Sequence, residues 1–378
     1  MGILPHQWKQ RFEPRAFVRR LDEWSIADVL AAPLIAFDPF ETQFEAVEDA
    51  QYYQSTHRRS PPMPQGAIDV MTWNIKFGGA RIDFWFDGHG SRVLLKEWEV
   101  VANLEGVAAK INRADPDVLL LQEIDVDSKR VAFVDQMQWL LDHTALNDGA
   151  YASQWRANFV PSDGLGRVDT GIAILSKYPV VDAQRLALPE IGSRDPVTRY
   201  FYLKRAILTA GIEIPGYDAV RAVNIHTEPF AGDGTKQRQL ECFHGELDRL
   251  DSAGTTFVAG GDLNTLAPGT KKQHGFDDVV SEDQDFQCGD YRQQSDWLAS
   301  LYEHYTPAVD LDSYRRDNSP HFTHSTSGKT FWNRKLDYLF TNGEFVDGSA
   351  LTHQDRSSGG MKTMLLSDHA PVSVSLRL

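Results

Sequence analysis

The chain has 378 residues, 42 % of them hydrophobic, which is enough to bury the core of one large domain or of two ordinary ones. Its 53 Asp and Glu outnumber 38 Lys and Arg, and the net charge of −15 disfavours non-specific adhesion of the whole surface to nucleic acid or anionic lipid. The two cysteines, Cys242 and Cys288, lie in different segments without a CxxC pattern or a Cys/His cluster, so neither a disulfide framework nor a structural zinc site is indicated.

Residues 1–66 are predicted to form a helical extension and a Pro-rich linker, and residues 67–378 the main domain. The segment 15–32 (RAFVRRLDEWSIADVLAA) has helical spacing of its large apolar residues, and SPPMPQG follows at 60–66. The apolar run VLAAPLIAF is short and interrupted by Pro33, so we expect neither a signal peptide nor a membrane span, and a soluble cytoplasmic protein. We expect the extension to pack on the main domain or on a second subunit.

From Ile68 onward, short apolar runs alternate with helical patterns, which is typical of a layered α/β protein. The predicted strands are 68–73, 117–121, 171–175, 219–225, 255–259, 336–340 and 372–376. An amphipathic helix is predicted within 91–112, where apolar residues recur every three or four positions at Leu94, Trp98, Val101, Leu104, Ala108 and Ile111. A second helix is predicted at 234–250, with Leu240, Phe243, Leu247 and Leu250 on one stripe and Gly254 as a stop.

Polar residues of similar chemistry stand at the ends of nearly every predicted strand. Taken singly, an Asn or Asp there makes a turn or caps a helix. As a set, carboxylates, amides and imidazoles recur where Ser, Gly and Pro would be expected among simple turn formers. The set comprises Asn74, Glu123, Asn224, His226, Asp262, Asn264, Asp337, Asp368 and His369.

If these strands lie side by side, their tips meet at one end of a sheet. Several carboxylates gathered in a shallow pit could not all stay ionised without a counter-cation. Carboxylate oxygens with amide neighbours suit Mg²⁺ or Mn²⁺ better than Zn²⁺, which prefers His and Cys. A divalent ion in such a pit can polarise a phosphoryl oxygen and assist the attack of water, so the pattern indicates hydrolysis of a phosphate ester.

The same segments resemble the endonuclease/exonuclease/phosphatase superfamily, which has the DNase I-like fold. The resemblance rests on MTWNI, LLLQEI, GIAILSKYPV, VNIHT, GGDLN, KLDYLF and SDHAPV, in the family's order over about residues 68–378. It implies a four-layer α/β sandwich, with two packed mixed β-sheets flanked by helices. It also implies Mg²⁺- or Mn²⁺-dependent attack of water on a phosphate ester.

On the metal side, the resemblance implies that Glu123 is the principal ligand, with Asn74 beside it and Asp368 completing the set. The same resemblance assigns the remaining tips to catalysis. Asp262 would orient or deprotonate the attacking water, and Asn264 would hold the phosphate and that water in line. Asp337 would pair with His369, which faces the phosphate, while His226 would contact a phosphate oxygen or assist the leaving group.

Four further residues are candidates for contacting the substrate: Arg205, Asn224, Arg81 and Trp85. Arg205 falls where family members often carry a basic residue, although a structural salt bridge explains it equally well. The loop 76–92 interleaves aromatic residues with Arg81 and Arg92, and it could stack a nucleobase, dip toward a lipid or fill a gap against the sheet. The aromatic loop 285–305 is predicted to form another wall.

The remaining histidines and Glu228 are weaker candidates. His321 and His324 have a metal-like spacing, but their segment reads as a loop and the start of a strand, so a ligand role is not expected. His244 is predicted to be an ordinary surface or packing residue of the second helix. Glu228, just after His226, could support the site from a second layer.

The expected function is therefore a Mg²⁺- or Mn²⁺-dependent phosphodiesterase whose partner is a phosphate-ester substrate. A nuclease acting on DNA or RNA, or a sphingomyelinase-like phospholipid hydrolase, remains open as the alternative, because catalytic tips specify reaction type only. GDLNTLAPG and NRKLDYLF depart from the inositol 5-phosphatase pattern, and QEIDVDSKR with GRVDTGIAI departs from that of abasic-site nucleases. A member that kept the fold only for protein binding is disfavoured, because every motif position bears a chemically competent side chain.

Overall fold

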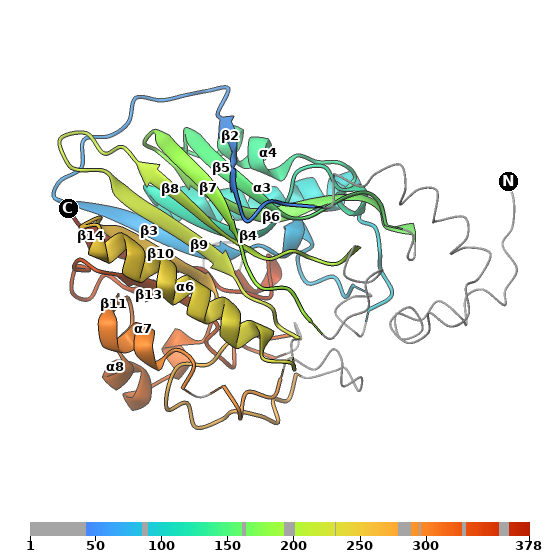
Figure 1. The fold of residues 1–378 in the computed structure, drawn as a ribbon. Coiled ribbons are helices and arrows are strands. Elements are labelled where there is room, and N and C mark those ends of the chain that lie inside the picture. The colour runs from blue at the N-terminus through green and yellow to red at the C-terminus, as the bar shows by residue number, and fades with distance from the viewer. Residues whose placement is uncertain are drawn as a thin grey trace, which may run out of the picture.

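The computed structural model describes residues 43–84, 90–160, 164–192, 201–230, 232–278, 289–294, 296–326, 330–354 and 363–378. It contains two seven-stranded mixed sheets, shown in Figure 1. The first has the order β1-β7-β8-β9-β10-β12-β11 and the second the order β13-β14-β3-β4-β6-β5-β2. This arrangement confirms the predicted DNase I-like fold class.

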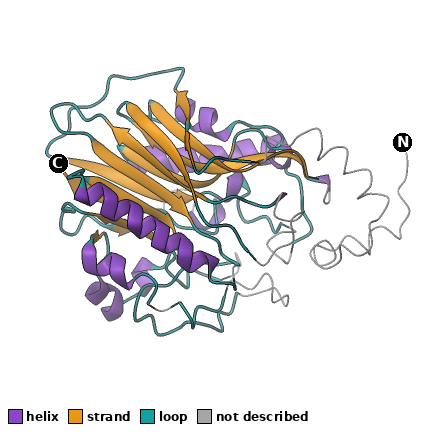
Figure 2. Cartoon of the chain, in the orientation of Figure 1, coloured by secondary structure: helices purple, strands orange, loops and turns teal. Residues whose placement is uncertain are grey.

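The first sheet comprises β1 (Val47–Asp49), β7 (Val180–Ala187), β8 (Ala206–Ile212), β9 (Val220–His226), β10 (Phe257–Asp262), β12 (Asp337–Thr341) and β11 (Thr306–Pro307). The second comprises β13 (Leu351–Thr352), β14 (Val372–Arg377), β3 (Ala67–Asn74), β4 (Val118–Asp125), β6 (Gly166–Ser176), β5 (Asp148–Val160) and β2 (Gln51–Gln54). The helices are α3 (Glu97–Ala114), α4 (Gln136–His143), α6 (Thr235–Ser252), α7 (Ala299–His304) and α8 (Leu311–Arg316). Figure 2 shows the helices on the outer sides of the strands.

Three apolar layers hold the sandwich together. Val118 and Leu120 of β4 face Ala222 of β9 and Val258 of β10 in the layer between the sheets. Leu119 and Leu121, the alternate residues of β4, instead pack under α3 and α4. On the other side, α6, α7 and α8 cover β9, β10 and β12. A strand buried on both faces needs a continuous apolar run, which explains the VLLL of β4.

All seven strands predicted from the sequence are present, as β3, β4, β6, β9, β10, β12 and β14. The helix predicted at 234–250 is α6, and its predicted stripe is buried. The helix predicted within 91–112 begins later, at Glu97, and its buried stripe includes Val100 and Val107 rather than Trp98, which is 65 % exposed. Part of the predicted loop wall 285–305 is the helix α7.

The proposed boundary at residue 66 is crossed by the sheets. β1 pairs with β7 and β2 pairs with β5, so residues 47–54 extend one edge of each sheet. This part of the predicted extension therefore packs on the main domain as strands rather than helices. The helix predicted at 15–32 lies outside the described residues. No helix within the described ranges is long and apolar enough to cross a membrane.

Two glycines bring β10 close to its neighbours. A Cβ added to Gly260 would lie 1.9 Å from the carbonyl oxygen of Tyr338, and one added to Gly261 would lie 2.0 Å from that of Ile225. Real Cβ atoms do not approach backbone oxygens this closely, so only glycine permits β10 to lie between β9 and β12 here. These glycines immediately precede Asp262.

We expect Gly260→Ala to destabilise the protein by about 3 kcal/mol, because the added methyl group must displace the backbone of β12. Gly245→Ala is the matched control, since no atom of the described residues lies within 4 Å of its added Cβ. Alanine favours an exposed helical position, so the control should be neutral or stabilising. Chemical denaturation monitored by circular dichroism measures both changes. Equal stability of the two variants would contradict the steric role of Gly260.

Candidate active site

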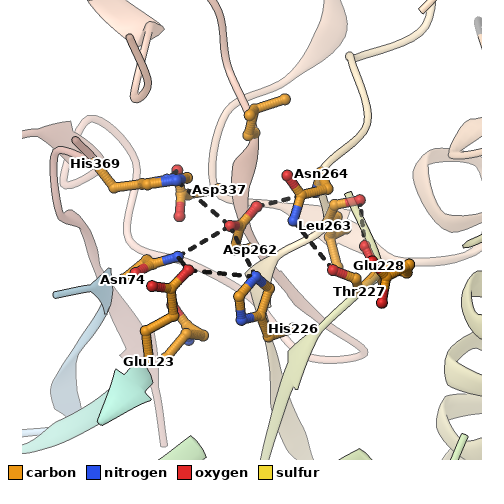
Figure 3. Close-up of polar contacts among 12 residues, drawn as sticks. Asn74, Glu123, His226, Thr227, Glu228, Asp262, Leu263, Asn264, Asp337 and His369 are labelled. Carbon is orange, nitrogen blue, oxygen red and sulfur yellow. Dashed lines mark hydrogen bonds and ion pairs between the residues drawn. The ribbon is translucent and has the colours of Figure 1, made fainter. Parts of the chain in front are cut away.

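The strand tips predicted from the sequence meet at one end of the sandwich. The parallel strands β3 and β4 bring Asn74 and Glu123 to this end, where Glu123 lies two residues before the end of β4. The parallel strands β9 and β10 end there with His226 and Asp262. β12 runs antiparallel and begins there, so that Asp337 lies directly opposite Asp262. Figure 3 shows these side chains turned toward one another, although they come from both sheets.

Backbone irregularities direct two of these side chains into the site. Glu123 has a φ of 53° and lies where the β4–β6 register shifts between Gln122 and Ile124. Such a bulge re-aims one side chain out of the pleat. Asn264 has a φ of 46°. Non-glycine residues adopt left-handed conformations at a cost, and such residues cluster at functional sites.

Asp262 is the centre of the hydrogen-bond network. One carboxylate oxygen, Oδ1, accepts from the backbone N–H of Asn264 at 3.0 Å. The other, Oδ2, accepts from Nδ2 of Asn74 at 3.2 Å and lies 3.4 Å from Nε2 of His226. The residue is only 1 % exposed, and burial raises the pKa of its carboxyl to about 7. Asp262 therefore exchanges protons near neutral pH.

His369 and Asp337 form a buried acid–imidazole pair. Nδ1 of His369 lies 2.8 Å from Oδ2 of Asp337, while Nε2 lies 3.5 Å from Oδ2 of Asp262. Burial opposes the imidazolium, but the charges of Asp337 and Asp262 outweigh it and raise the pKa of His369 to about 10. His369 is therefore a cation at neutral pH, and Nε2 is the nitrogen that faces the site.

His226 has the opposite character. Burial and the positive charges of Arg205 and His369 lower the pKa of His226 well below its usual value, so it is neutral at pH 7. Its Nε2 lies 3.4 Å from Asp262 and 3.9 Å from Oε1 of Glu123. The site thus offers one charged and one neutral imidazole on two sides of the same carboxylate.

Glu123 and Asp368 form the more open, acidic side of the site. Their side chains are 31 % and 19 % exposed, respectively. Burial and the charge of Asp368 raise the pKa of Glu123. For Asp368, burial is outweighed by Lys76, His369 and Arg81, and its pKa is lowered. Nζ of Lys76 lies 3.9 Å from Asp368.

The donor set suits a hard divalent cation. Glu123 and Asp368 provide carboxylate oxygens without cysteine, and the amide group of Asn74 lies beside Glu123. The electrostatic repulsion between Glu123 and Asp368 is the kind that a cation relieves. Asn74 currently gives its Nδ2 to Oε1 of Glu123 at 3.0 Å, while its Oδ1 accepts from the backbone N–H of Lys76. These residues fit Mg²⁺ or Mn²⁺.

Asn264 is tied to the end of β9. Its Nδ2 donates to the carbonyl oxygen of Thr227 at 3.1 Å, and Nζ of Lys236 donates to the carbonyl oxygen of Asn264 at 2.7 Å. The loop after β10 is therefore held by both β9 and the first turn of α6. This support fixes the position of the Asn264 amide beside Asp262.

The four expected substrate contacts have different locations. Asn224 is fully buried beneath the site, where Nδ2 donates to the carbonyl oxygens of Leu121 and Ala173 at 2.8 Å each and Oδ1 accepts from Gln122. It joins the two sheets and does not line the opening, so the expectation that it touches substrate is replaced by a structural role. Trp85 lies outside the described residues.

Arg81 clamps three loops together. Its guanidinium donates to the carbonyl oxygens of Ser325 and Met364 and lies 5.1 Å from the ring of Trp332. Its charge still reaches Asp368, as the pKa shift of that carboxyl shows. The positive charge of Arg205 lowers the pKa of both Glu123 and His226. Its Nε lies 3.6 Å from Oε2 of Glu228, whose other oxygen accepts from the hydroxyl group of Tyr202.

Two residues near the site were not predicted to belong to it. Lys76 follows Asn74 by two positions and is 4 % exposed. Its position directly after TWNI is the feature of the sequence that could have indicated its place near the site. The ring of His324 lies 4.4 Å from that of His369, and the two residues form an isolated antiparallel bridge. No sequence pattern indicates this contact, because His324 and His369 are far apart along the chain. His321, which has a metal-like spacing from His324 in the sequence, is not part of the network of site residues described above.

The chain also matches a known protein family. Residues 71–369 match the model of the Endonuclease/Exonuclease/phosphatase family. A comparison with curated proteins gave no match.

Several solved structures share the fold. An endonuclease/exonuclease/phosphatase from Beutenbergia cavernae DSM 12333 is 21 % identical with a TM-score of 0.54, over 83 % of this chain and 72 % of that chain. A functionally unknown conserved protein from Enterococcus faecalis V583 is 16 % identical with a TM-score of 0.50, over 82 % and 99 %. The human Nocturnin catalytic domain with bound sulfate anion is 16 % identical with a TM-score of 0.50, over 86 % and 96 %. At these identities, the likeness concerns the fold.

The buried charge of His369 can be tested by NMR titration of its ring protons in the metal-free protein. We expect His369 to remain protonated through neutral pH and to titrate near pH 10, because Asp337 holds the imidazolium. In Asp337→Asn the pKa should fall by at least about one unit, since the negative charge that raises it most is lost. A wild-type pKa near 6.5 would contradict the assignment.

Proposed function

The chain belongs to the endonuclease/exonuclease/phosphatase family, and from this premise we propose that it is a divalent-metal-dependent phosphodiesterase. The observation that carries the proposal is the meeting of Asp262, Glu123, His226 and His369 in one group, whose carboxylate oxygens and ring nitrogens lie within 4 Å of a neighbour in the group. These side chains come from both sheets, and neither sheet alone holds them. A protein that kept this fold only for binding would have no need of such a group, so the complete set favours an enzyme.

Asp262 is proposed to orient and deprotonate the attacking water. A general base works best when its pKa lies near the operating pH, and burial raises that of Asp262 to about 7. The backbone N–H of Asn264 holds one carboxylate oxygen of Asp262. This hydrogen bond also fixes the orientation of the second oxygen. The amide of Asn264, held by Thr227, is proposed to bind the phosphate and keep the water in line.

His369 and His226 are proposed to stabilise the charge that develops on the phosphate. The imidazolium of His369 presents Nε2 toward Asp262, so it can donate to a phosphoryl oxygen placed beside that carboxylate. His226 is neutral and also presents Nε2 there, which suits it to contact a phosphate oxygen or assist the leaving group. Asp337 acts through His369 by keeping the ring charged and fixing its orientation.

Glu123 and Asp368, with the amide oxygen of Asn74, are proposed to hold Mg²⁺ or Mn²⁺. Such an ion supplies Lewis-acid polarisation of the phosphoryl oxygen and offsets negative charge on the leaving group. Lys76 is proposed to keep Asp368 ionised, because it lies 3.9 Å from that carboxylate.

The substrate class is proposed to be a phosphodiester, either a nucleic acid or nucleotide diester or a phospholipid-type diester. Arg205 is retained as a candidate phosphate contact, because its charge is felt at both Glu123 and His226. The net charge of −15 favours a small or locally contacted substrate over a long duplex. Two cysteines in 378 residues support activity in a reducing compartment, such as the cytoplasm.

Hydrolysis of bis-p-nitrophenyl phosphate with Mg²⁺ or Mn²⁺ tests the reaction. We expect wild-type turnover that His369→Ala reduces on the order of 10²–10³-fold at saturating metal, because a preorganised charge is lost. Glu123→Gln should instead raise the metal concentration needed for half-maximal rate. The exposed Glu105→Gln serves as the control and should match wild type. Wild-type turnover no faster than that of Asp262→Asn would contradict an enzymatic role.

The substrate class can be resolved by two parallel assays on the same preparation. Nicking of supercoiled plasmid would identify a nuclease, whereas release of choline phosphate from a sphingolipid would identify a phospholipid-type hydrolase. In either case we expect Asp262→Asn to abolish the product, because the same carboxylate serves both reactions. A product that persists in this variant would come from a contaminant or a different site.

A further inference from the structure

Two helices bring three potential metal ligands together far from the catalytic residues. His244 and Asp248 lie one turn apart on α6, and His304 is the last residue of α7. Figure 1 shows α7 next to α6 on the outer side of the sheet. His304 leads into β11, whose Thr306 pairs with Thr341 at the end of β12 opposite to Asp337. This cluster is therefore separate from the site at the strand tips.

Two of the three distances between donor atoms are close to those around one small cation. Nε2 of His244 lies 3.1 Å from Nδ1 of His304 and 3.5 Å from Oδ1 of Asp248. One ligand atom from each of the three residues lies within 4.8 Å of the others. Metal–ligand bonds of about 2.0–2.1 Å in a tetrahedral zinc site place neighbouring ligand atoms about 3.3 Å apart.

The surrounding residues hold this arrangement. The hydroxyl group of Tyr305 donates to Oδ1 of Asp248 at 2.5 Å, and its ring packs edge-on against Phe257 of β10. His244 contacts the same ring, so Tyr305 positions two of the three ligands. Hydrogen-bonded partners of this kind orient ligands at metal sites. The neighbouring Phe243 and Leu247 anchor α6 in the core below.

The present histidine contact is compatible with entry of a cation. The two rings are nearly parallel, at 2°, and meet nitrogen to nitrogen, so one imidazole donates to the other. A cation would replace that proton and require the rings to tilt. The side chains of His244 and Asp248 are 19 % and 53 % exposed, which leaves a path from solvent and room for the tilt.

We propose that His244, Asp248 and His304 form a transition-metal site of the zinc type, which ties α7 to α6. Two imidazoles and one carboxylate suit Zn²⁺ and leave a fourth position for water, whereas Mg²⁺ prefers oxygen ligands alone. The preference for a different metal ion therefore distinguishes this site from the catalytic carboxylates. Because α7 has only six residues, a metal bond to α6 would add to the contacts that fix its end.

The test measures zinc retained by the full-length protein after dialysis against low Zn²⁺ with excess Mg²⁺, which competes at the carboxylate site. We expect wild type to retain one more zinc ion than His304→Gln. The affinity for zinc should fall at least about 10-fold in that variant. His304→Cys should restore retention, because a thiolate is also a zinc ligand. The exposed His274→Gln is the control and should match wild type.

A second readout separates this site from the catalytic one. Zinc should raise the unfolding temperature of wild type and of His304→Cys but not of His304→Gln, because a ligand stabilises only a fold that binds it. Phosphodiester hydrolysis should be the same in all three. Equal zinc content in wild type and His304→Gln, or loss of the bound zinc only in Glu123→Gln, would overturn the proposal.

Discussion

The alignment of the two sheets depends on a small buried polar network beneath the site. The amide of Asn224 in β9 donates to the carbonyl oxygens of Leu121 and Ala173 in the opposite sheet and accepts from Gln122. The apolar contacts around it are non-directional and would tolerate sliding of one sheet over the other, whereas hydrogen bonds fix direction and distance. Directly above, Asn74 of β3 reaches Asp262 of β10. These contacts set the strand tips of both sheets at the same height.

That alignment gathers like charges, and the surrounding groups offset the cost. Glu123, Asp262, Asp337 and Asp368 all border one site, and burial raises the pKa of the first two. The imidazole ring of His369 lies between the carboxylates of Asp337 and Asp262, and the ammonium group of Lys76 lies close to Asp368. Left-handed conformations at Glu123 and Asn264 add local strain. The fold thus accepts a locally unfavourable arrangement of negative charge that a divalent cation would relieve.

The sequence predicted the strands that carry the site better than β5 and β8. β4 and β10 are buried on both faces, so their apolar runs are continuous and their polar ends stand out. β5 mixes buried polar residues such as Gln154 with small ones, and β8 is rich in small residues, which gives a weaker signal. Spacing alone predicts Trp98 in the buried stripe, but only packing against the sheet decides which face of α3 is inward.

The same limit applies to individual side chains in the site. The roles of Asp262, Glu123 and His369 could be predicted, because turns and helix caps do not explain a whole set of carboxylates and imidazoles at strand ends. Whether an amide such as Asn224 points into the opening or back between the sheets depends on the partner strand, which the sequence does not specify. The pairing of His244 with His304 likewise arises only when α7 packs beside α6.

Paramagnetic broadening by Mn²⁺ tests most directly whether these residues form one cation-binding site. The NMR ring signals of His226 and His369 would be followed as Mn²⁺ is added in small amounts to the metal-free protein. We predict that both signals broaden together, that the exposed His274 stays sharp, and that excess Mg²⁺ reverses the effect. If neither His226 nor His369 responds, or if one broadens without the other, the two histidines do not face a shared metal ion.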